Sequence, residues 1–338
     1  MRRRLHELIK RLSPVGVSAN REDFRPARAR SQPRALQREV PSSHRRPGTP
    51  GRIISIVNRK GGVGKTTLAI GIADAFVSEH RADVSVVDLD PQSTASQALL
   101  EGDEFAARVY NDRNLHGLLK ARLRGEDPDV KEYRRSGLHL IKAREDVDLR
   151  LYPNSDRLWD LEASEIRKDG GTRLLGAIQR ILNEEAGDGR LVVVDCPPGQ
   201  SVSALAAIRS SHMVLCPITP DRYALWGMNL LHTYIRAHAP EIRPKRIKFV
   251  VTRATLVGNE ARGVLKRLFG APEMLRVVTG GITRGAPDGL ALFSERQTVR
   301  ARIQMQREST LRGIYGSKVS SELTHIVNAI RRELEQRG

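Results

Sequence analysis

The chain contains few aromatic residues and few cysteines. Phe, Trp and Tyr make up 4% of its 338 residues, and its two cysteines are Cys196 and Cys216. Both lie within or directly after apolar runs, which argues against a disulfide framework and favours a reducing compartment. No apolar run approaches the roughly 18 residues that a transmembrane helix needs, so we expect a soluble, cytoplasmic protein without a stable membrane anchor.

Basic residues are in excess, and the excess lies at the two ends of the chain. Residues 1–50 hold 13 Lys or Arg against 4 Asp or Glu, residues 51–240 hold 25 against 26, and residues 241–338 hold 19 against 9. A nearly neutral body between two basic regions points to a polyanionic partner. We favour DNA over an anionic lipid surface and over plain solvation, because the last third has a folded pattern and does not need this charge for solubility alone.

The first 50 residues differ in composition from the rest. Residues 1–12 carry one apolar helical face surrounded by Arg and Lys, whereas residues 13–50 are rich in Arg, Pro and Ser and predict a disordered tether. A cleaved transit peptide would also be rich in Arg, but the four acidic residues argue against one. We therefore expect a retained basic arm, 1–50, followed by a globular domain, 51–338, with a basic C-terminal region.

From Gly51 onward, strand and helix patterns alternate. Such alternation predicts an α/β fold with a mostly parallel twisted sheet and helices on both faces. Strands are expected at 53–57, 84–88, 138–141, 191–195, 213–216 and 247–252, and helices at 65–79, 115–123, 172–183, 203–209, 225–237, 259–269 and 320–336.

The stretch 53–68, IISIVNRKGGVGKTTL, contains a β-type run, a glycine-rich loop and the start of a helix. Backbone N–H groups that point at phosphate oxygens need conformations that glycine tolerates best. The helix dipole and Lys65 add positive charge, and the Thr66 hydroxyl is placed for Mg²⁺. The alternative to a phosphate-binding loop is a simple glycine turn between strand and helix with incidental lysines. We predict a nucleoside triphosphate site formed by Lys60, Gly61, Gly62, Val63, Gly64, Lys65, Thr66 and Thr67.

Two other apolar runs end in acidic residues. Asp88 and Asp90 follow one run two positions apart, and Asp195 ends the run LVVVD. Ligands of open α/β sheets collect at the carboxyl edge of the strands, so these carboxylates are expected beside the magnesium-bound triphosphate. A third run ends in a loop braced by Pro217 and Pro220, which is placed to hold a nucleotide base but could merely terminate the strand.

Four motifs together resemble the ParA/MinD family of deviant Walker A ATPases. They are KGGVGKTT from Lys60, DLDPQ from Asp88, VVVDCPPG from Val192 and CPITPDRYALWGMNLL from Cys216. Their order and spacing agree with the family over roughly residues 52–300. The resemblance implies the P-loop NTPase fold, ATP and Mg²⁺ as ligands, and hydrolysis of ATP to ADP and phosphate.

The resemblance also implies a role for each residue of the site. Lys60 would cross a nucleotide-sandwich homodimer to the phosphates of the second copy, so that ATP joins the two subunits. Lys65 would bind the β- and γ-phosphates, and Asp90 would orient or activate the attacking water. We expect Lys60, Lys65 and Asp90 to be the catalytic residues.

Magnesium would be held by the remaining polar residues of these motifs. The resemblance implies that Thr66 ligates the ion, that Asp195 lies beside it, and that Asp88 lies near the metal and the switch region. Pro217 and Pro220 would contact the adenine.

Within the family the chain looks most like ParA, which partitions plasmids and chromosomes. The resemblance implies nonspecific, ATP-dependent DNA binding, release by a ParB-like centromere-binding protein, and association with the nucleoid. Winged-helix ParA proteins need more chain before the phosphate loop than the 50 residues here, so we do not expect operator-specific repression. Candidate DNA contacts are Lys245, Arg246, Lys248, Arg262, Lys266, Arg267, Arg300, Arg302 and Arg307.

Two alternatives remain open. In a MinD-like positioning ATPase, the apolar face of residues 1–12 or the C-terminal helix would enter an anionic membrane. An iron–sulfur electron-transfer ATPase of related fold would need Cys196 and Cys216 at a dimer interface, and the purified protein would then be coloured. The cargo is open as well, whether plasmid, chromosome, integrative element or protein cluster.

Deletion of residues 2–50 tests the predicted division of the chain. Because a disordered tether is expected to separate the short helix 1–12 from the globular domain, the truncated protein should keep its fold, with cooperative unfolding as in the full chain. Its affinity for DNA, or its response to a partner protein, should fall, because 13 positive charges are removed. A truncated protein that cannot fold would show that the arm is part of the core.

Overall fold

The structure, a computed structural model, describes most of the chain from Gly51 onward. The described residues are 51–138, 147–221, 223–243, 246–252, 263, 264, 267, 274, 292, 293 and 311–336. The predicted arm, 1–50, lies outside them, as does most of the predicted helix 259–269. The division between arm and domain therefore stays a prediction.

Seven strands in the described residues form one sheet, in the order β3-β2-β4-β1-β5-β6-β7. Every neighbouring pair of strands is parallel, which confirms the predicted fold class. The strands are β1 (Arg52–Ile56), β2 (Val84–Asp88), β3 (Leu149–Tyr152), β4 (Leu191–Asp195), β5 (Met213–Ile218), β6 (Ile247–Thr252) and β7 (Leu292–Phe293).

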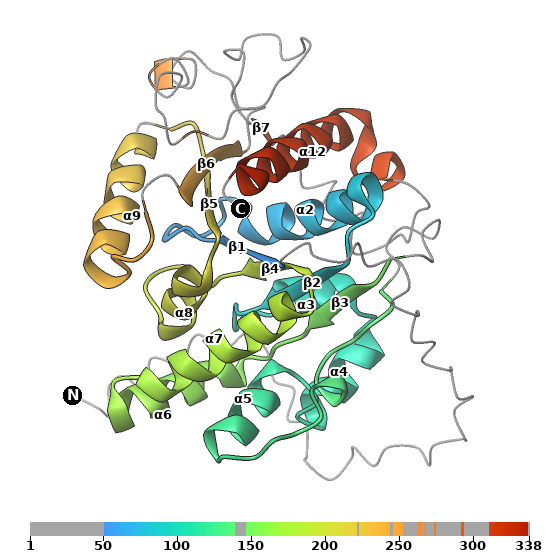
Figure 1. Cartoon of the computed structure of the whole chain (residues 1–338), viewed down its shortest axis with the longest axis vertical. Helices are drawn as coiled ribbons and strands as arrows, with labels where there is room; N and C mark the ends of the chain where they lie inside the picture. The colour runs from blue at the N-terminus through green and yellow to red at the C-terminus, as the bar shows by residue number, and fades with distance from the viewer. Residues whose placement is uncertain are drawn as a thin grey trace, which may run out of the picture. The chain divides into compact units, whose positions relative to one another are not determined.

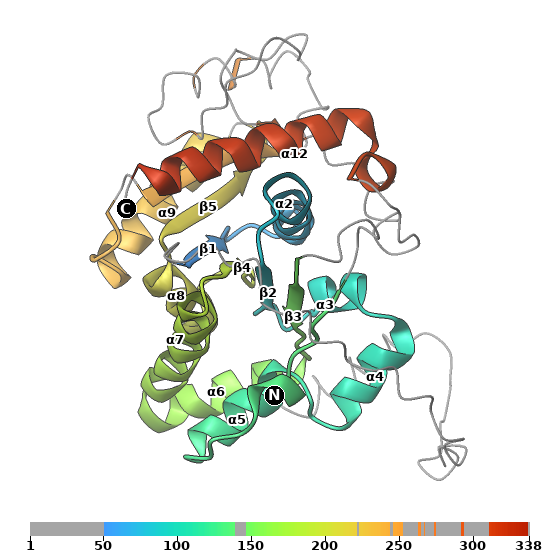
Figure 2. The same cartoon turned by 45° about the vertical axis from the view of Figure 1, so that its right-hand side comes forward.

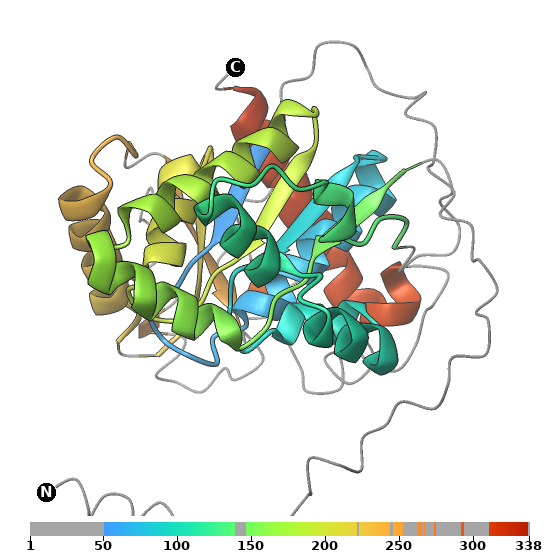
Figure 3. The same cartoon turned by 90° about the horizontal axis from the view of Figure 1, so that it is seen from below.

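Helices cover both faces of this sheet, so its central strands are buried on both sides (Figure 1). One hydrophobic core packs α2, α3 and α12 against the sheet. A second hydrophobic core packs α5, α6, α7, α8 and α9 against it. Figure 3 shows α5, α6 and α7 in front of the strands. The helices are α2 (Lys65–His80), α3 (Thr94–Leu99), α4 (Gly102–Tyr110), α5 (Leu115–Leu123), α6 (Arg157–Asp169), α7 (Thr172–Gly187), α8 (Val202–Ser210), α9 (Ala224–His238) and α12 (Leu311–Glu335), with a 3-10 turn at Val130–Glu132.

The predicted and observed strands agree at the centre of the sheet, whereas the two edge strands, β3 and β7, were not predicted. β3 begins at Leu149 and pairs with β2. The strand expected at 138–141 lies outside the described residues except for Leu138, which is not in a strand. Helices α3, α4 and α6 were not predicted. No helix among the described residues is long and apolar enough to cross a membrane.

Helices α2 and α12 lie side by side in close contact (Figure 2). A Cβ added at Gly71 would approach the Leu323 side chain to 2.9 Å, so glycine sets the spacing of the two helices there. The Tyr315 hydroxyl donates a hydrogen bond to the buried Asp74 carboxyl of α2. Burial raises the pKa of Asp74 to about 7, although this hydrogen bond opposes the rise.

Asp74 should make stability depend on pH. Its pKa is higher in the folded protein than in the unfolded chain, so the stability that it contributes is full below about pH 4 and is lost as the pH rises toward about 7. The contribution is on the order of 4 kcal/mol. In Asp74→Asn, urea unfolding should show a smaller loss of stability between pH 4 and 7 than in the wild type. Tyr315→Phe keeps the carboxyl and should keep the slope; equal slopes in Asp74→Asn and wild type would contradict this assignment.

Candidate nucleotide-binding site

The glycine-rich loop joins β1 to α2 at the carboxyl edge of the sheet. Gly62 and Gly64 adopt positive φ angles of 70° and 86°, and Gly64 caps the N-terminus of α2. Gly61 and Gly62 are exposed, and a Cβ added at either would meet no heavy atom within 4 Å, so the space beside the loop is open. A helix N-terminus behind an open glycine loop is suited to a phosphate group.

Lys65, the first residue of α2, is buried beneath this loop. Its charge lies near enough to Asp90 and Asp195 to lower the pKa of each carboxyl, although burial outweighs that effect in both. The Thr66 hydroxyl has the same lowering influence on Asp195. The structure thus brings Lys65 and Thr66 together with two of the three predicted acids.

Asp88 and Asp195 end neighbouring strands and are directly paired in register. Both side chains are fully buried. Burial, followed by the charge of Asp88, raises the pKa of Asp195 well above its ordinary range. Neither carboxylate oxygen of Asp195 has a hydrogen-bond partner of good geometry. Two buried oxygens without a hydrogen bond of good geometry, next to a threonine hydroxyl, suit a hard cation and its bound water.

Asp88 has a different environment, because the loop that follows it supplies hydrogen bonds. The backbone N–H and the hydroxyl of Ser96 donate to Oδ2 at 2.8 and 2.6 Å, and the Asp90 N–H donates to Oδ1 at 3.1 Å. Burial still raises the pKa of Asp88 to about 7. The hydrogen bonds indicate that Asp88 holds the loop 89–96 in place as well as facing the site.

Asp90 follows Asp88 by two residues and lies in the same loop. Its Oδ1 accepts a hydrogen bond from the Gln92 N–H at 2.9 Å, which fixes the carboxyl orientation. Burial raises the pKa of Asp90, against the lowering effects of this N–H and of Lys65. A carboxyl with a raised pKa beside a cationic lysine is suited to accept a proton from a water molecule.

Within the described residues, no group of three or more His, Cys, Asp or Glu side chains is arranged to hold a metal ion. The candidate magnesium ligands of the chain are instead Thr66 and Asp195, with Asp88 nearby. Because Mg²⁺ in proteins commonly takes one or two side chains and completes its shell with phosphates and waters, this donor set fits the ion when a triphosphate is present.

Lys60, at the front of the loop, forms an ion pair that the sequence did not predict. Its Nζ lies 2.9 Å from Oδ2 of Asp221, in the loop after β5. Partial burial raises the pKa of Asp221, but hydrogen bonds from the Thr219 hydroxyl and from Lys60 lower it more, to below the ordinary value. A second link ties the same two loops, because the Asn58 amide donates to the Pro217 carbonyl at 2.6 Å. Pro217 and Pro220 are buried at this edge.

Asn154 is a further site residue that sequence reasoning missed. It follows β3 at the carboxyl edge and is fully buried. Its N–H donates to the Ser96 hydroxyl at 2.9 Å, and its amide lies 3.5 Å from the Asp90 carbonyl. Correct assignment of β3 would have placed Asn154 at the same edge as Asp88.

Glu162 of α6 was missed as well, and it acts on the loop that follows Asp195. Its buried carboxylate accepts the Val202 N–H at 2.5 Å and the Ser203 hydroxyl at 2.9 Å, both at the start of α8. The Ser201 hydroxyl oxygen caps the same helix by accepting the Ala204 N–H at 3.0 Å. The loop 196–201 is thus fixed at both ends, by β4 on one side and by Glu162 on the other.

The two cysteines are free and buried. Burial raises the pKa of both thiols. Neither cysteine is therefore presented on the surface as a ligand for a shared iron–sulfur cluster, which argues against that alternative.

The structure describes only some of the residues that were predicted to contact DNA. Arg267 is exposed and Arg246 is half-buried, whereas Lys248 is buried in β6 and lies 3.2 Å from Glu333 of α12. That position is less suited to DNA than an exposed arginine. Outside the described residues lie Lys245, Arg262, Lys266, Arg300, Arg302 and Arg307.

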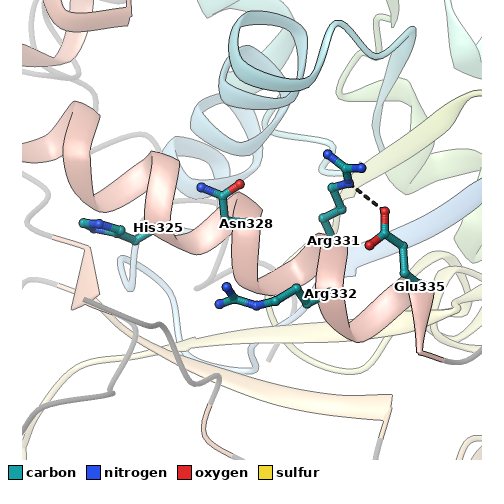
Figure 4. A pocket seen from close by; sticks show the side chains of 5 residues that line it. All are labelled: His325, Asn328, Arg331, Arg332 and Glu335. Atoms are coloured by element: carbon teal, nitrogen blue, oxygen red, sulfur yellow. Dashed lines mark hydrogen bonds and ion pairs between the residues drawn. The ribbon is translucent and has the colours of Figure 1, made fainter. Parts of the chain in front are cut away.

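A polar hollow of about 210 Å³ lies on α12, away from the phosphate loop (Figure 4). It is lined by His325, Asn328, Arg331, Arg332 and Glu335. Arg331 pairs with Glu335 at 2.7 Å, and Figure 4 shows Arg332 pointing away from that pair. The lining suits an anion more than an apolar ligand.

Comparisons with known proteins find an AAA domain in this chain and partition proteins among its relatives. A family profile described as an AAA domain matches residues 51–247. The chain is 32% identical over 192 residues to the chromosome partitioning protein ParA of Myxococcus xanthus, covering 55% of this chain and 58% of that protein. It is 30% identical over 224 residues to the chromosome-partitioning ATPase Soj of Thermus thermophilus, covering 65% and 77%. A replication protein A of Rhizobium rhizogenes is 31% identical over 191 residues, covering 55% and 44%. The chain spans about half the length of the first and third of these relatives.

Solved structures share the fold at lower identity. A plasmid partition protein of Borrelia burgdorferi bound to AMPPNP has a TM-score of 0.60 at 19% identity, covering 84% of this chain and 99% of that one. A variant of Cyanothece McdA in complex with ATP has a TM-score of 0.59 at 16% identity, covering 85% and 98%. A cobyrinic acid a,c-diamide synthase of Mycobacterium smegmatis with ADP and magnesium has 0.57 at 22%, covering 85% and 97%. The last enzyme shows that this fold alone does not decide the reaction.

Substitution of Glu162 tests its part in holding α8. Glu162→Ala leaves the Val202 N–H and the Ser203 hydroxyl without their acceptor, and should lower the free energy of unfolding by about 1–3 kcal/mol. Glu162→Gln keeps an oxygen that accepts the N–H and should lose less than half as much. Urea denaturation measures both, and equal losses would contradict the assignment.

Proposed function

Because the chain belongs to the AAA domain family and, within it, to the ParA/MinD type of P-loop ATPase, we propose that it is a DNA-partition ATPase. It hydrolyses ATP, dimerises on ATP, binds DNA nonspecifically in that form, and is released when a ParB-like partner stimulates hydrolysis. The observation that carries the ATPase part is the meeting of the open glycine loop, Lys65 and three carboxylates at one edge of the sheet.

Phosphate binding follows from the loop geometry. The backbone N–H groups around Gly62 and the N-terminus of α2 receive the phosphate oxygens, and Lys65 neutralises charge between the β- and γ-phosphates. Thr66 and Asp195 would hold Mg²⁺, which when bound supplies positive charge next to the reacting phosphate. The Asp195 carboxylate, which is buried beside the Thr66 hydroxyl and has no hydrogen bond of good geometry, would gain a counter-charge in that arrangement.

Asp90 is the group that we assign to the attacking water. The Gln92 N–H orients its carboxylate, and the raised pKa makes it a stronger base than an exposed aspartate. Most of the rate enhancement comes from positioning the water and the phosphate in line, and the Asp88 to Ser96 hydrogen bonds hold Asp90 for that task.

Dimerisation gives Lys60 its second role. In the single chain its amine is paired with Asp221, and both side chains are partly exposed to solvent. An exposed pair of this kind contributes about 1 kcal/mol or less, so the triphosphate of a second copy can replace Asp221 as the partner of Lys60.

DNA binding is supported by charge and by the named relatives. The last third of the chain carries 19 basic against 9 acidic residues, and two of the relatives are chromosome-partitioning proteins by name. Among the described residues, exposed Arg267 and the hollow on α12 with Arg332 are the surfaces best suited to phosphate contacts. Release by a ParB-like partner is part of the same proposal.

Two substitutions separate nucleotide binding from hydrolysis. Lys65→Ala should abolish binding of a fluorescent ATP analogue, because the buried ammonium is lost. Asp90→Ala should still bind ATP, dimerise and bind DNA, while its turnover falls by about 100-fold or more. Normal hydrolysis by Asp90→Ala would show that another group activates the water.

Cosedimentation tests the proposed partner. With ATP and Mg²⁺ the protein should sediment with DNA and not with anionic liposomes, and without nucleotide it should do neither. Binding to liposomes but not to DNA would favour a membrane-positioning ATPase. A protein that stays monomeric with ATP, or that binds DNA equally well without it, would contradict the proposal.

A further inference from the structure

An apolar patch is exposed at the start of α9. Tyr223, Leu225 and Trp226 have exposed fractions of 54%, 37% and 63%. The inner side of the same helix is fully used, because Met228, Leu231 and Ile235 are buried in the core. The patch is therefore not a displaced part of the core. Large exposed apolar groups that lie together commonly mark an interface.

The patch borders the phosphate loop. Asp221, which holds the Lys60 amine at 2.9 Å, also accepts the Tyr223 N–H at 2.9 Å. One carboxylate thus connects Lys60 with the first residue of the patch. Further along α9, the Arg59 guanidinium acts on Tyr234: burial raises the pKa of that phenol and Arg59 lowers it in part. The front of the phosphate loop and α9 are therefore neighbours.

We propose that a second copy of this chain buries the patch of Tyr223, Leu225 and Trp226 when ATP binds. The inference rests on the proposed function, in which Lys60 reaches the nucleotide of a second copy. The loop of Lys60 is also tied to the loop before α9 by the hydrogen bond from the Asn58 amide to the Pro217 carbonyl, so a second copy that receives Lys60 approaches the start of α9.

Physical requirements of a dimer favour this occupant. Two lysines that cross to phosphates do not form a stable contact by themselves, since specific interfaces bury on the order of 1,000 Å² or more. Aromatic residues are enriched at the centres of such interfaces. In a two-fold dimer one patch on each copy serves both sides, so a single cluster next to Lys60 supplies apolar contact twice.

The chain provides its own spectroscopic probe. Its two tryptophans are Trp226, in the patch, and Trp159, which is 51% exposed on α6. Trp159→Phe leaves Trp226 as the one reporter, and Trp226→Phe leaves Trp159 as the matched control. With Mg²⁺ and a non-hydrolysable ATP analogue, Trp226 emission should shift to shorter wavelength, and its acrylamide quenching should fall about threefold as in a buried interface position. Trp159 should change in neither respect.

A substitution tests whether the patch contributes to association. Trp226→Ser should raise the dimer dissociation constant by about tenfold or more, as interface aromatics commonly do. Analytical ultracentrifugation with the same analogue measures it, and Trp159→Ser is the control that should dimerise as the wild type does. Binding of a fluorescent nucleotide to monomeric Trp226→Ser should stay unchanged, which shows that the variant is folded.

The outcomes separate this inference from the proposed function. If the wild type stays monomeric with the analogue, the proposed dimer is wrong and the inference is overturned with it. If the wild type dimerises while Trp226 stays accessible and Trp226→Ser dimerises normally, only the inference is wrong. Protection of Trp226 that requires added DNA or another protein, and not the second copy, would also overturn it by assigning a different occupant.

Discussion

Buried negative charge at the carboxyl edge of the sheet is the constraint on which the site depends. Parallel pairing of β2 and β4 places Asp88 directly opposite Asp195, and Asp90 lies two residues beyond. The charge of Lys65 lowers the pKa of Asp90 and of Asp195, but burial raises the pKa values of Asp88, Asp90 and Asp195 by more. Carboxylates in such a place are unfavourable unless a cation or a proton compensates them. A magnesium-bound triphosphate is a ligand that brings this compensation with it.

The surrounding structure keeps this unfavourable arrangement in one geometry. Ser96 and Asn154 hold the loop after β2, and Glu162 holds the start of α8 from a separate helix. The network at the amino end of β2 is arranged differently. There Glu185 accepts hydrogen bonds from Ser85 and Tyr152 and pairs with Arg134, and the pKa of Glu185 falls despite its burial. At the amino end of β2, side chains of the protein itself compensate the negative charge of Glu185. At the carboxyl edge, compensation of the three carboxylates is left to a ligand.

The central site could be predicted because its signals are local. An apolar run that ends in an acid places Asp88 and Asp195, and the glycine loop places Lys65. The edge strand could not be chosen in this way, since LHLI at Leu138 and LRLY at Leu149 show the same alternation. Pairing with β2 and the hydrogen bond from Tyr152 to Glu185 favour the second. Glu162 was equally hidden, because a lone acid on an amphipathic helix predicts a surface position and its partners lie about 40 residues away.

The Lys60 to Asp221 pair explains how one lysine can serve two partners. The pair is exposed and therefore weak, so its exchange for a triphosphate needs little free energy. Asp221 does not depend on Lys60 for its position, because the Thr219 hydroxyl donates to Oδ2 at 2.6 Å and the Tyr223 N–H donates to Oδ1 at 2.9 Å. In the proposed dimer, these two hydrogen bonds would hold the loop and the start of α9 in place after Lys60 exchanges Asp221 for a triphosphate. A surface that is already ordered would lose less entropy on association.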